Sequence, residues 1–576
     1  MNLLPTVNYV SGDLLLFLPE LIVTAAIVML LLLRMFRGFD RVQLGWCALI
    51  LTLFALAVSA WQWVESKPTD SVPIFAGMIV YDSLTNYLRV LLLSATAITI
   101  LLTLQTGIPD REDSADFHVL LLGGTLGMLL MSSAYHLLMA YIAVEMASLP
   151  SYALAGFLKG RRQSSEAALK YVVYGGGASG VMLYGISLLA GRFGTAYLPD
   201  LATAYASVLK NQATTGGVDA LLVLGTLFIL IGLAFKLSAV PFHFWCPDVF
   251  EGAAAEVAAF LSVASKSAAF ALTARILLVL SATAGPDTWL LARYFGVPLA
   301  FLAALTATFG NLAAYPQNNL KRLLAYSTIA HAGYMLMGLA VLTAEGARSV
   351  VFYLATYVFM NLGAFAVVAF LRNRTGSEDL RDYRGLIYRA PGLVVLLAIF
   401  LLSLLGMPPL AGFVAKFQVF AALFHGGQEV ASKVPWLSAV YYGLLVIGGV
   451  NTVFSLFYYV RVLKVMILEK PLEEIEGRPA TDLGVPTVAV AYTGVLALVV
   501  LALGIVWNPL AEASDQSVRR FAPLAAVQAR PLIPAATKAP AEKAPPKGGA
   551  RGKGGNAKGG KGGAKQKAKD EPKAKG

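Results

Sequence analysis

The segment LIGLAFKLSAVPFHFWCPDVF, residues 230–250, places a lysine and then a proline inside an apolar run. A second segment, LLGMPPLAGFVAKF at residues 404–417, repeats the combination with two prolines before Lys416. The surrounding runs, 219–245 and 392–424, are too long for one simple membrane span of about 20 residues. Paired broken helices in the two halves of a transporter indicate an ion pathway at an inverted repeat. At either place alone, a proline kink without a transport role is the alternative.

Apolar runs recur along the whole chain. Of its 576 residues, 57% are hydrophobic and 14% are charged, which is too little polar surface for a water-soluble globule. The sequence therefore predicts an all-α polytopic membrane protein of about fourteen transmembrane helices, two of them broken. The predicted helices lie near residues 14–34, 42–62, 79–104, 117–134, 137–157, 168–190, 219–245, 255–282, 291–313, 324–343, 348–371, 392–424, 437–466 and 486–507.

Basic residues in short loops predict the orientation of these helices, because cytoplasmic loops are enriched in Lys and Arg. The loops after odd-numbered helices carry Arg34, Arg37, Arg41, Arg111, Lys159, Arg161, Arg162, Lys321, Arg322, Arg372, Arg374, Arg381, Arg384, Arg389, Lys470 and Arg478. The loops after even-numbered helices are poorer in basic residues. The odd loops are therefore predicted to be cytoplasmic, with both termini on the outer side.

The sequence lacks the motifs of several function classes. Cys47 and Cys246 stand far apart, the five histidines show no metal-ligand spacing, and neither a GxGxxG unit nor a Walker A loop is present. We therefore expect no cofactor in this chain, and any electron transfer or nucleotide hydrolysis to occur on a partner.

The C-terminal region, residues 511–576, is predicted to be a disordered basic tail rich in Lys, Gly, Ala and Pro. It carries most of the net charge of +12. Contact with anionic lipids or with a partner is one interpretation, and a dispensable solvated extension is the other. Its basic character alone is no sign of nucleic-acid binding.

Four charged residues fall near the middle of predicted spans. They are Glu145, Lys236, Lys266 and Lys416. Each costs roughly 2.5–3.5 kcal/mol at mid-bilayer on insertion scales, so these side chains are expected to face a polar protein interior. Lys170 is close enough to a helix end for its ammonium group to reach water.

Such groups suit a proton path. A buried lysine has its pKa lowered by desolvation, whereas a nearby carboxylate raises it again, so a Glu–Lys pair that opens and closes switches the lysine between holding and releasing a proton. Glu145 with Lys236 is the expected pair, Lys266 and His331 the middle relay, and Lys416 the far gate. A single structural ion pair, or for His331 a packing role, is the alternative for each residue alone.

Several motifs resemble those of the antiporter-like subunits of respiratory complex I. They are MAYIAVEMASLPSYALAGF (139–157), FKLSAVPFHFWCPDVFEGA (235–253) followed by SVASK (262–266), NLKRLLAYSTIAHAGYMLMG (319–338) and LLGMPPLAGFVAKF (404–417), with LPELI around Glu20 and YDSLTNYLRV around Asp82. The resemblance covers roughly residues 12 to 507. PDVFEGA and a lysine at position 416 are similar to the subunit N branch, the relatives of mitochondrial subunit 2.

The resemblance implies a proton-translocating subunit of NADH:quinone oxidoreductase in a bacterial inner membrane. The resemblance implies Glu145, Lys236, Lys266 and Lys416 as pathway residues, with Lys170 tuning the Glu145–Lys236 pair. It implies partner subunits that hold NADH, FMN, iron–sulfur clusters and quinone. Antiporter-like paralogues and membrane lipids are further implied partners. The implied regions are N-terminal helices (1–116), two inverted five-helix repeats (117–282 and 283–468), a cytoplasmic loop with helix 14 (469–510) and the tail (511–576).

Two other functions are possible on the same scaffold: an Mrp-type cation/proton antiporter subunit and a non-pumping scaffold. The chain also departs from the family pattern in GAAAEVAAF, residues 252–260, where relatives commonly carry prolines. Glu256 is either an extra carboxylate at the cytoplasmic entrance or a solvated loop residue, and we favour the second interpretation.

Overall fold

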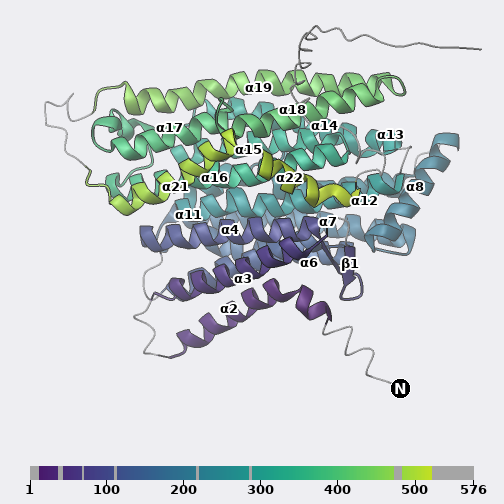
Figure 1. The fold of residues 1–576 in the computed structure, drawn as a ribbon, viewed down its shortest axis with the longest axis horizontal. Helices are drawn as coiled ribbons and strands as arrows, with labels where there is room; N and C mark the ends of the chain where they lie inside the picture. The colour runs from purple at the N-terminus through teal and green to yellow at the C-terminus, as the bar shows by residue number, and fades with distance from the viewer. Residues whose placement is uncertain are drawn as a thin grey trace, which may run out of the picture. The chain divides into compact units, whose positions relative to one another are not determined.

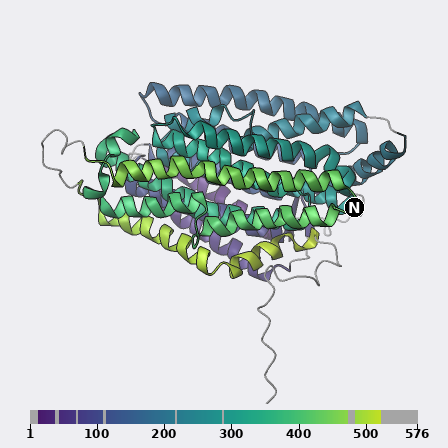
Figure 2. The ribbon, with the colours of Figure 1, turned by 90° about the horizontal axis from the view of Figure 1, so that it is seen from above.

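The computed structural model describes residues 12–36, 43–67, 71–108, 113–215, 219–284, 288–471 and 483–521. These residues form helices that run side by side, with one short β-hairpin (Figure 1). The same alignment of the helices is visible from above (Figure 2).

The described chain contains twenty α-helices with full bounds. They are α2 (Leu18–Arg34), α3 (Gly45–Glu65), α4 (Ser83–Thr106), α5 (Ser114–Ser133), α6 (Leu137–Ala155), α7 (Arg162–Phe193), α8 (Leu198–Thr215), α9 (Ala220–Leu237), α10 (Trp245–Gly252), α11 (Ala255–Phe260), α12 (Lys266–Ala284), α13 (Thr288–Leu291), α14 (Val297–Ala314), α15 (Leu320–Ala340), α16 (Ala344–Thr375), α17 (Pro391–Leu405), α18 (Ala411–Val430), α19 (Pro435–Ile467), α21 (Thr487–Ile505) and α22 (Asn508–Val518). Strands β1 (Ser71–Ile74) and β2 (Ile79–Asp82) pair antiparallel, and the π-helical turns η2 (Leu261–Ser265) and η4 (Ala292–Gly296) join α11 to α12 and α13 to α14.

Each of the fourteen predicted runs coincides with a helix, or with helices joined by a break or a π-helical turn. Within the described ranges, twelve helices are long and apolar enough to cross a membrane. The all-α membrane class is thus confirmed. The count of fourteen spans and the inverted repeats stay predictions, since α2 and α17, with 17 and 15 residues, are short for a span.

Close helix contacts depend on small residues, as is typical of membrane bundles. A Cβ on Gly127 of α5 would lie 2.3 Å from the backbone nitrogen of Ala147 in α6. A Cβ on Gly333 of α15 would lie 2.4 Å from the nitrogen of Ala307 in α14. These two helix pairs could not pack as they do with larger side chains at the two glycine positions.

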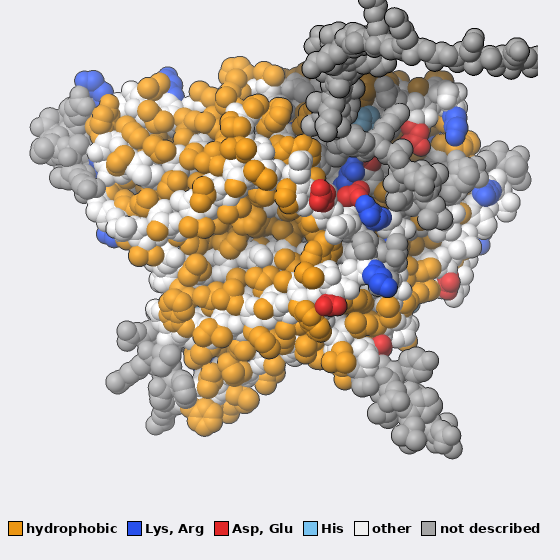
Figure 3. Space-filling model, in the orientation of Figure 1, with side chains coloured by type: hydrophobic (Ala, Val, Ile, Leu, Met, Phe, Trp, Pro, Cys, Tyr) orange, Lys and Arg blue, Asp and Glu red, His pale blue; other side chains and the backbone are white. Residues whose placement is uncertain are grey.

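The outer surface matches a lipid environment. Hydrophobic side chains cover the middle of the helices on the face shown in Figure 3, and charged side chains gather toward the helix ends. At one end Arg34 bonds Asp116, Lys159 bonds Asp113 at 2.6 Å, and Asn373 bonds the Thr106 carbonyl at 3.0 Å. We call this the basic-loop end. The predicted orientation assigns it to the cytoplasm.

Three elements were not predicted. The helix α8 lies between two predicted spans, and α22 follows the last one. The hairpin β1–β2 precedes α4, and its strand β2 replaces the start of the helix predicted at 79–104. The boundary predicted at residue 511 falls inside α22, so ordered chain continues to Phe521. The rest of the predicted tail, 522–576, lies outside the described residues.

A fully buried ion pair fixes the end opposite the basic loops. Arg275 of α12 binds both carboxylate oxygens of Asp82, at 2.7 and 3.1 Å, and also the Ser132 carbonyl at 2.9 Å. Arg520, just after α22, bonds the same carboxylate at 2.9 Å. Burial raises the pKa of Asp82, but the two guanidinium groups outweigh burial and hold this pKa well below its usual range. The resulting stabilisation is therefore complete above about pH 4 and is lost as the pH falls toward the folded pKa.

We expect Arg275→Met to lower the thermal-unfolding midpoint of the detergent-purified assembly strongly. Removing one partner of a buried ion pair costs about 3–5 kcal/mol, a cost that the remaining Arg520 reduces. Arg192→Met, which breaks a partly exposed pair with Asp219 at 2.9 Å, is the matched control and should cost at most about 1 kcal/mol. Equal shifts for the two variants would contradict a stabilising role of the buried cluster.

Candidate functional site

The first predicted helix break lies between α9 and α10. The helix α9 ends at Leu237, and Ser238 follows in the left-handed conformation with φ 56°. Trp245, the first residue of α10, turns back and donates its indole N–H to the Phe235 carbonyl at 3.0 Å. The Thr306 hydroxyl accepts the backbone N–H of Val240, also at 3.0 Å. Side chains thereby satisfy part of the backbone that the break frees.

The second break separates α17 from α18. Gly406 caps α17 with φ +93°, and a Cβ at this position would lie 3.1 Å from Cδ of Lys416. Its N–H bonds the Ser403 carbonyl at 2.9 Å, while the Ser403 hydroxyl accepts the N–H of Gly412 at 3.1 Å. Glycine is thus required both by the turn and by the lysine chain lying against it.

Each break presents a carbonyl to a buried lysine. Lys266 Nζ donates to the Leu237 carbonyl at 3.3 Å, at the end of α9. Lys416 Nζ donates to the Leu405 carbonyl at 2.8 Å, at the end of α17. The side chains of the two lysines are 1% and 4% exposed. A helix C-terminus carries partial negative charge, so both ammonium groups are stabilised without a carboxylate partner.

Glu145 and Lys236 form a separated pair. Lys236, 3% exposed, lies in the last turn of α9, and Glu145 of α6 is half-buried. The two groups interact electrostatically, yet Glu145 Oε1 and Lys236 Nζ each lack a hydrogen-bond partner among the described residues. The structure thus places the expected pair in range of each other with no direct ion pair in the described chain.

His331 of α15 lies between the other two lysines. Its buried imidazole is in electrostatic range of both Lys266 and Lys416. Nδ1 is 2.7 Å from the Tyr353 hydroxyl and Nε2 is 3.3 Å from the Tyr459 hydroxyl. Each ring nitrogen therefore has a hydroxyl partner that can donate or accept.

Lys170 takes part in a different cluster. Its ammonium group bonds Glu166 at 2.8 Å and Asp248 at 2.7 Å. Asp248 of α10 also bonds Arg322 at 2.7 Å. The structure places Lys170 against α10, directly after the first break. The predicted tuning of Glu145–Lys236 by Lys170 stays a prediction.

The solvated-loop interpretation of Glu256 is wrong. Its side chain is 0% exposed and lies against Arg372, with Oε1 at 3.4 Å from Nη2. The residue is the second of α11 and lies inside the helix packing, because α16 packs against α11.

The tyrosines around His331 and Lys416 were not identified from the sequence. The ring of Tyr334 lies 4.5 Å from Lys416 Nζ, and the Tyr459 hydroxyl is 2.5 Å from the Ser327 hydroxyl. The sequence does contain a signal for one of these tyrosines, Tyr334. Tyr334 follows His331 by three residues on one helix, a spacing that places the two on the same face.

These features define a class: a polytopic membrane protein with two broken helices and a buried line of lysines and histidine. A family model described as "NADH:quinone oxidoreductase/Mrp antiporter, TM" matches residues 134–440, which include both breaks. The chain belongs to this family.

The full-length comparisons agree. NADH-quinone oxidoreductase subunit N of Anaeromyxobacter sp. (strain Fw109-5) is 39% identical over 533 residues, covering 90% of this chain and 99% of the relative. The subunit N of Rhodospirillum rubrum is 37% identical over 500 residues, covering 86% and 96%. A chain of respiratory complex I from Thermus thermophilus superposes with a TM-score of 0.67 at 31% identity, covering 86% of this chain and 99% of that one. The resemblance to the subunit N branch is thereby confirmed.

A chain of the Mrp complex from Dietzia sp. DQ12-45-1b gives a TM-score of 0.73 at 20% identity, covering 88% of this chain and 97% of that one. It shares the fold. The neighbours are subunits of large assemblies, and this chain is likewise a membrane-spanning subunit of a multi-subunit complex.

We expect Tyr353→Phe to slow proton transfer through His331, because it removes the shorter hydrogen bond to the imidazole. Loss of one positioned proton partner should reduce coupled turnover several-fold, within the roughly 10²-fold that such groups contribute at the low end. Tyr357→Phe is the matched control, since Tyr357 contacts the same imidazole with its ring, at 5.2 Å between centroids. Turnover and proton uptake of the intact assembly are the measurements. Equal effects of the two changes would contradict a specific role of the Tyr353 hydroxyl.

Proposed function

We propose that this membrane subunit of the NADH:quinone oxidoreductase family moves protons across the bilayer along Glu145, Lys236, Lys266, His331 and Lys416. One observation carries the proposal: both helix breaks hold the C-terminal carbonyl of a half-helix against a buried lysine. His331 lies in electrostatic range of both of these lysines. Half-helix ends that point at ion sites are typical of membrane transport proteins.

The first step is a change at Glu145 and Lys236. When the two approach, the carboxylate stabilises Lys236 as the cation and the lysine holds its proton. When they separate, as in this structure, an isolated buried ammonium group is unfavourable and its proton moves on. Because Lys236 Nζ and Glu145 Oε1 are buried without partners in the described chain, water is the natural carrier between them and the next group.

The later steps follow the two breaks. The neutral amine of Lys266 accepts the proton, and the resulting ammonium group donates to the Leu237 carbonyl. His331 passes it on through its two ring nitrogens, and Lys416 receives it against the Leu405 carbonyl. Each transfer moves one proton and leaves the donor neutral, so a positive charge advances along the line without any other bond change.

Energy for the pathway comes from outside this chain. We propose that partner subunits bind NADH, FMN, iron–sulfur clusters and quinone, and that quinone reduction there drives the Glu145–Lys236 change. The other partners are antiporter-like paralogues in the same membrane, together with peripheral subunits and membrane lipids. The bacterial inner membrane is the proposed location, and Lys170 is proposed to tune the first pair.

The test is Lys236→Ala in the intact assembly, with quinone reductase rate and proton uptake measured in the same membrane vesicles. Both activities should fall together by at least about tenfold, since a titrating group of the path is lost. Lys433→Ala, at an exposed lysine after α18, is the control and should leave both unchanged.

Other results separate the alternatives. Assembly, turnover and pumping at wild-type levels in Lys236→Ala would refute the relay and leave a scaffold. Proton movement that depends on sodium or potassium ions and not on quinone reduction would indicate an Mrp-type antiporter instead.

A further inference from the structure

Glu256 is a buried carboxylate to which the relay above gives no role. It lies in the first turn of α11, ten residues before Lys266 on the continuous helix α11–η2–α12. At 1.5 Å per residue the two Cα atoms are about 15 Å apart along the axis. Oε1 of Glu256 contacts Arg372, whereas its buried Oε2 has no hydrogen-bond partner among the described residues. A buried carboxylate oxygen without a hydrogen-bond partner costs free energy, so a water molecule or a proton is expected at this atom.

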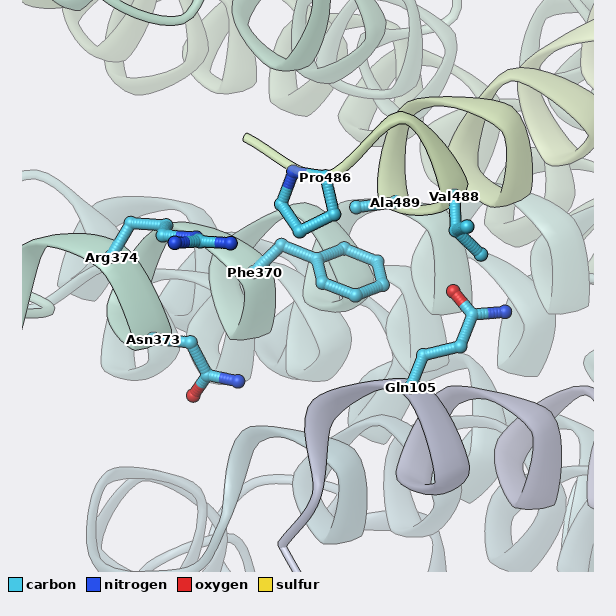
Figure 4. Close-up of a pocket in the computed structure, with 7 residues that line it drawn as sticks. All are labelled: Gln105, Phe370, Asn373, Arg374, Pro486, Val488 and Ala489. Carbon is cyan, nitrogen blue, oxygen red and sulfur yellow. The ribbon is translucent and has the colours of Figure 1, made fainter. Parts of the chain in front are cut away.

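A pocket lies at the basic-loop end, next to the end of α16 that carries Arg372. It has a volume of about 410 Å³, enough for several waters. Three elements line it: the end of α4, the end of α16 and the start of α21 (Figure 4). The lining residues are Gln105, Phe370, Asn373, Arg374, Pro486, Val488 and Ala489.

Asn373 connects the pocket with Glu256. Its side-chain oxygen accepts a hydrogen bond from Nη2 of Arg372 at 2.7 Å, and the same Nη2 lies 3.4 Å from Glu256 Oε1. A chain of polar contacts therefore links the pocket wall, through the Arg372 guanidinium group, to the buried carboxylate of Glu256. Arg372 is a permanent cation beside Glu256, so it does not pass protons on.

The inner side of Glu256 is also polar. Asn361, on α16 like Arg372, donates to the Ser262 hydroxyl at 2.6 Å. The buried Oδ1 of Asn361 has no hydrogen-bond partner in the described chain. Ser262 belongs to the π-helical turn η2, which lies between Glu256 and Lys266. π-Helical turns are frequent at functional sites, and this one places a polar group midway along the route.

The charges that face Glu256 are balanced. Lys321 of α15 is 2% exposed, bonds the Ala253 carbonyl at 2.6 Å and pairs with Glu378 at 3.0 Å. Lys321 also interacts electrostatically with Glu256, as Tyr492 of α21 does. Two cations, Arg372 and Lys321, thus offset the two carboxylates, and addition of one proton to Glu256 adds one net charge that can move on.

We propose that Glu256 is a proton-carrying residue of an entrance that leads from this pocket to Lys266. A hydronium ion in the pocket gives its proton to the Glu256 carboxylate and leaves as water. The resulting carboxylic acid passes the proton to water beside Ser262 and Asn361, and that water passes it to the neutral amine of Lys266. Glu256 returns to the carboxylate beside Arg372. The proposal rests on the proposed function of Lys266 in the relay.

The first test is Glu256→Gln in the intact assembly, with proton uptake and quinone reductase rate measured in membrane vesicles and normalised to assembled complex. Proton uptake should fall by about tenfold or more, and Glu256→Asp should restore part of it and shift the pH profile. Glu20→Gln is the matched control. Glu20 is also 0% exposed and pairs with an arginine, Arg89 at 2.7 Å, but belongs to α2 outside the relay. Glu20→Gln should leave the number of protons taken up per electron transferred to quinone unchanged.

A second test leaves Glu256 in place. Val488→Cys puts a thiol on the pocket wall, and a charged, membrane-impermeant thiol reagent then blocks the pocket in folded complex. Proton uptake should fall only when the reagent reaches the basic-loop end, and the unsubstituted chain should not respond. Proton uptake at the wild-type level after complete labelling of Val488→Cys would refute the proposed entrance, even if the Glu256→Gln complex does not assemble.

Lys266→Ala distinguishes a failure of the entrance from a failure of the relay. If Lys266→Ala stops pumping while Glu256→Gln and the blocked pocket pump normally, the entrance is wrong and the relay stands. If Lys266→Ala also pumps normally, the relay itself is wrong.

Discussion

Backbone carbonyls that end a helix inside the membrane must find a donor, and this requirement organises the centre of the molecule. Water is scarce at that depth, and an unpaired carbonyl there costs several kcal/mol. The helices α9 and α17 both end in the interior, and Lys266 and Lys416 supply donors to Leu237 and Leu405. The same bonds stabilise two ammonium groups that are themselves costly to bury. Break and lysine therefore offset each other at both places in the fold.

The helices and the breaks could be predicted because they depend on local sequence. A span needs only a run of apolar residues, and a break needs a proline inside it. The helices α8 and α22 were missed because their mean hydropathy is too low for a span, and packing rather than composition holds them. The tail boundary at residue 511 was misplaced for the same reason.

The site could be predicted only in part. The lysines were recognisable because a charge in an apolar run is conspicuous in any sequence. Their partners were not, since the carbonyl that receives Lys266 is 29 residues away and the tyrosine that bonds His331 at Nε2 is 128 residues away. Glu256 follows a predicted loop, and its burial depends on α16, which lies more than a hundred residues later. Distances of this kind follow from packing, which periodicity does not encode.

The buried arginines near the helix ends and the buried lysines at the breaks have different kinds of partner. The buried arginines near the helix ends are paired with carboxylates: Arg275 with Asp82, and Arg89 with Glu20. An arginine cannot lose its proton in a protein, so the cations of these pairs do not exchange protons, and the pairs hold helices together. The buried lysines at the breaks have neutral partners, a carbonyl for each and a tyrosine ring for Lys416. A carboxylate in direct contact would hold such a lysine as the cation, whereas a carbonyl stabilises the cation weakly enough for the proton to leave. The choice of neutral partners is thus what allows these two positions to exchange protons while the arginine pairs keep the surrounding helices in place.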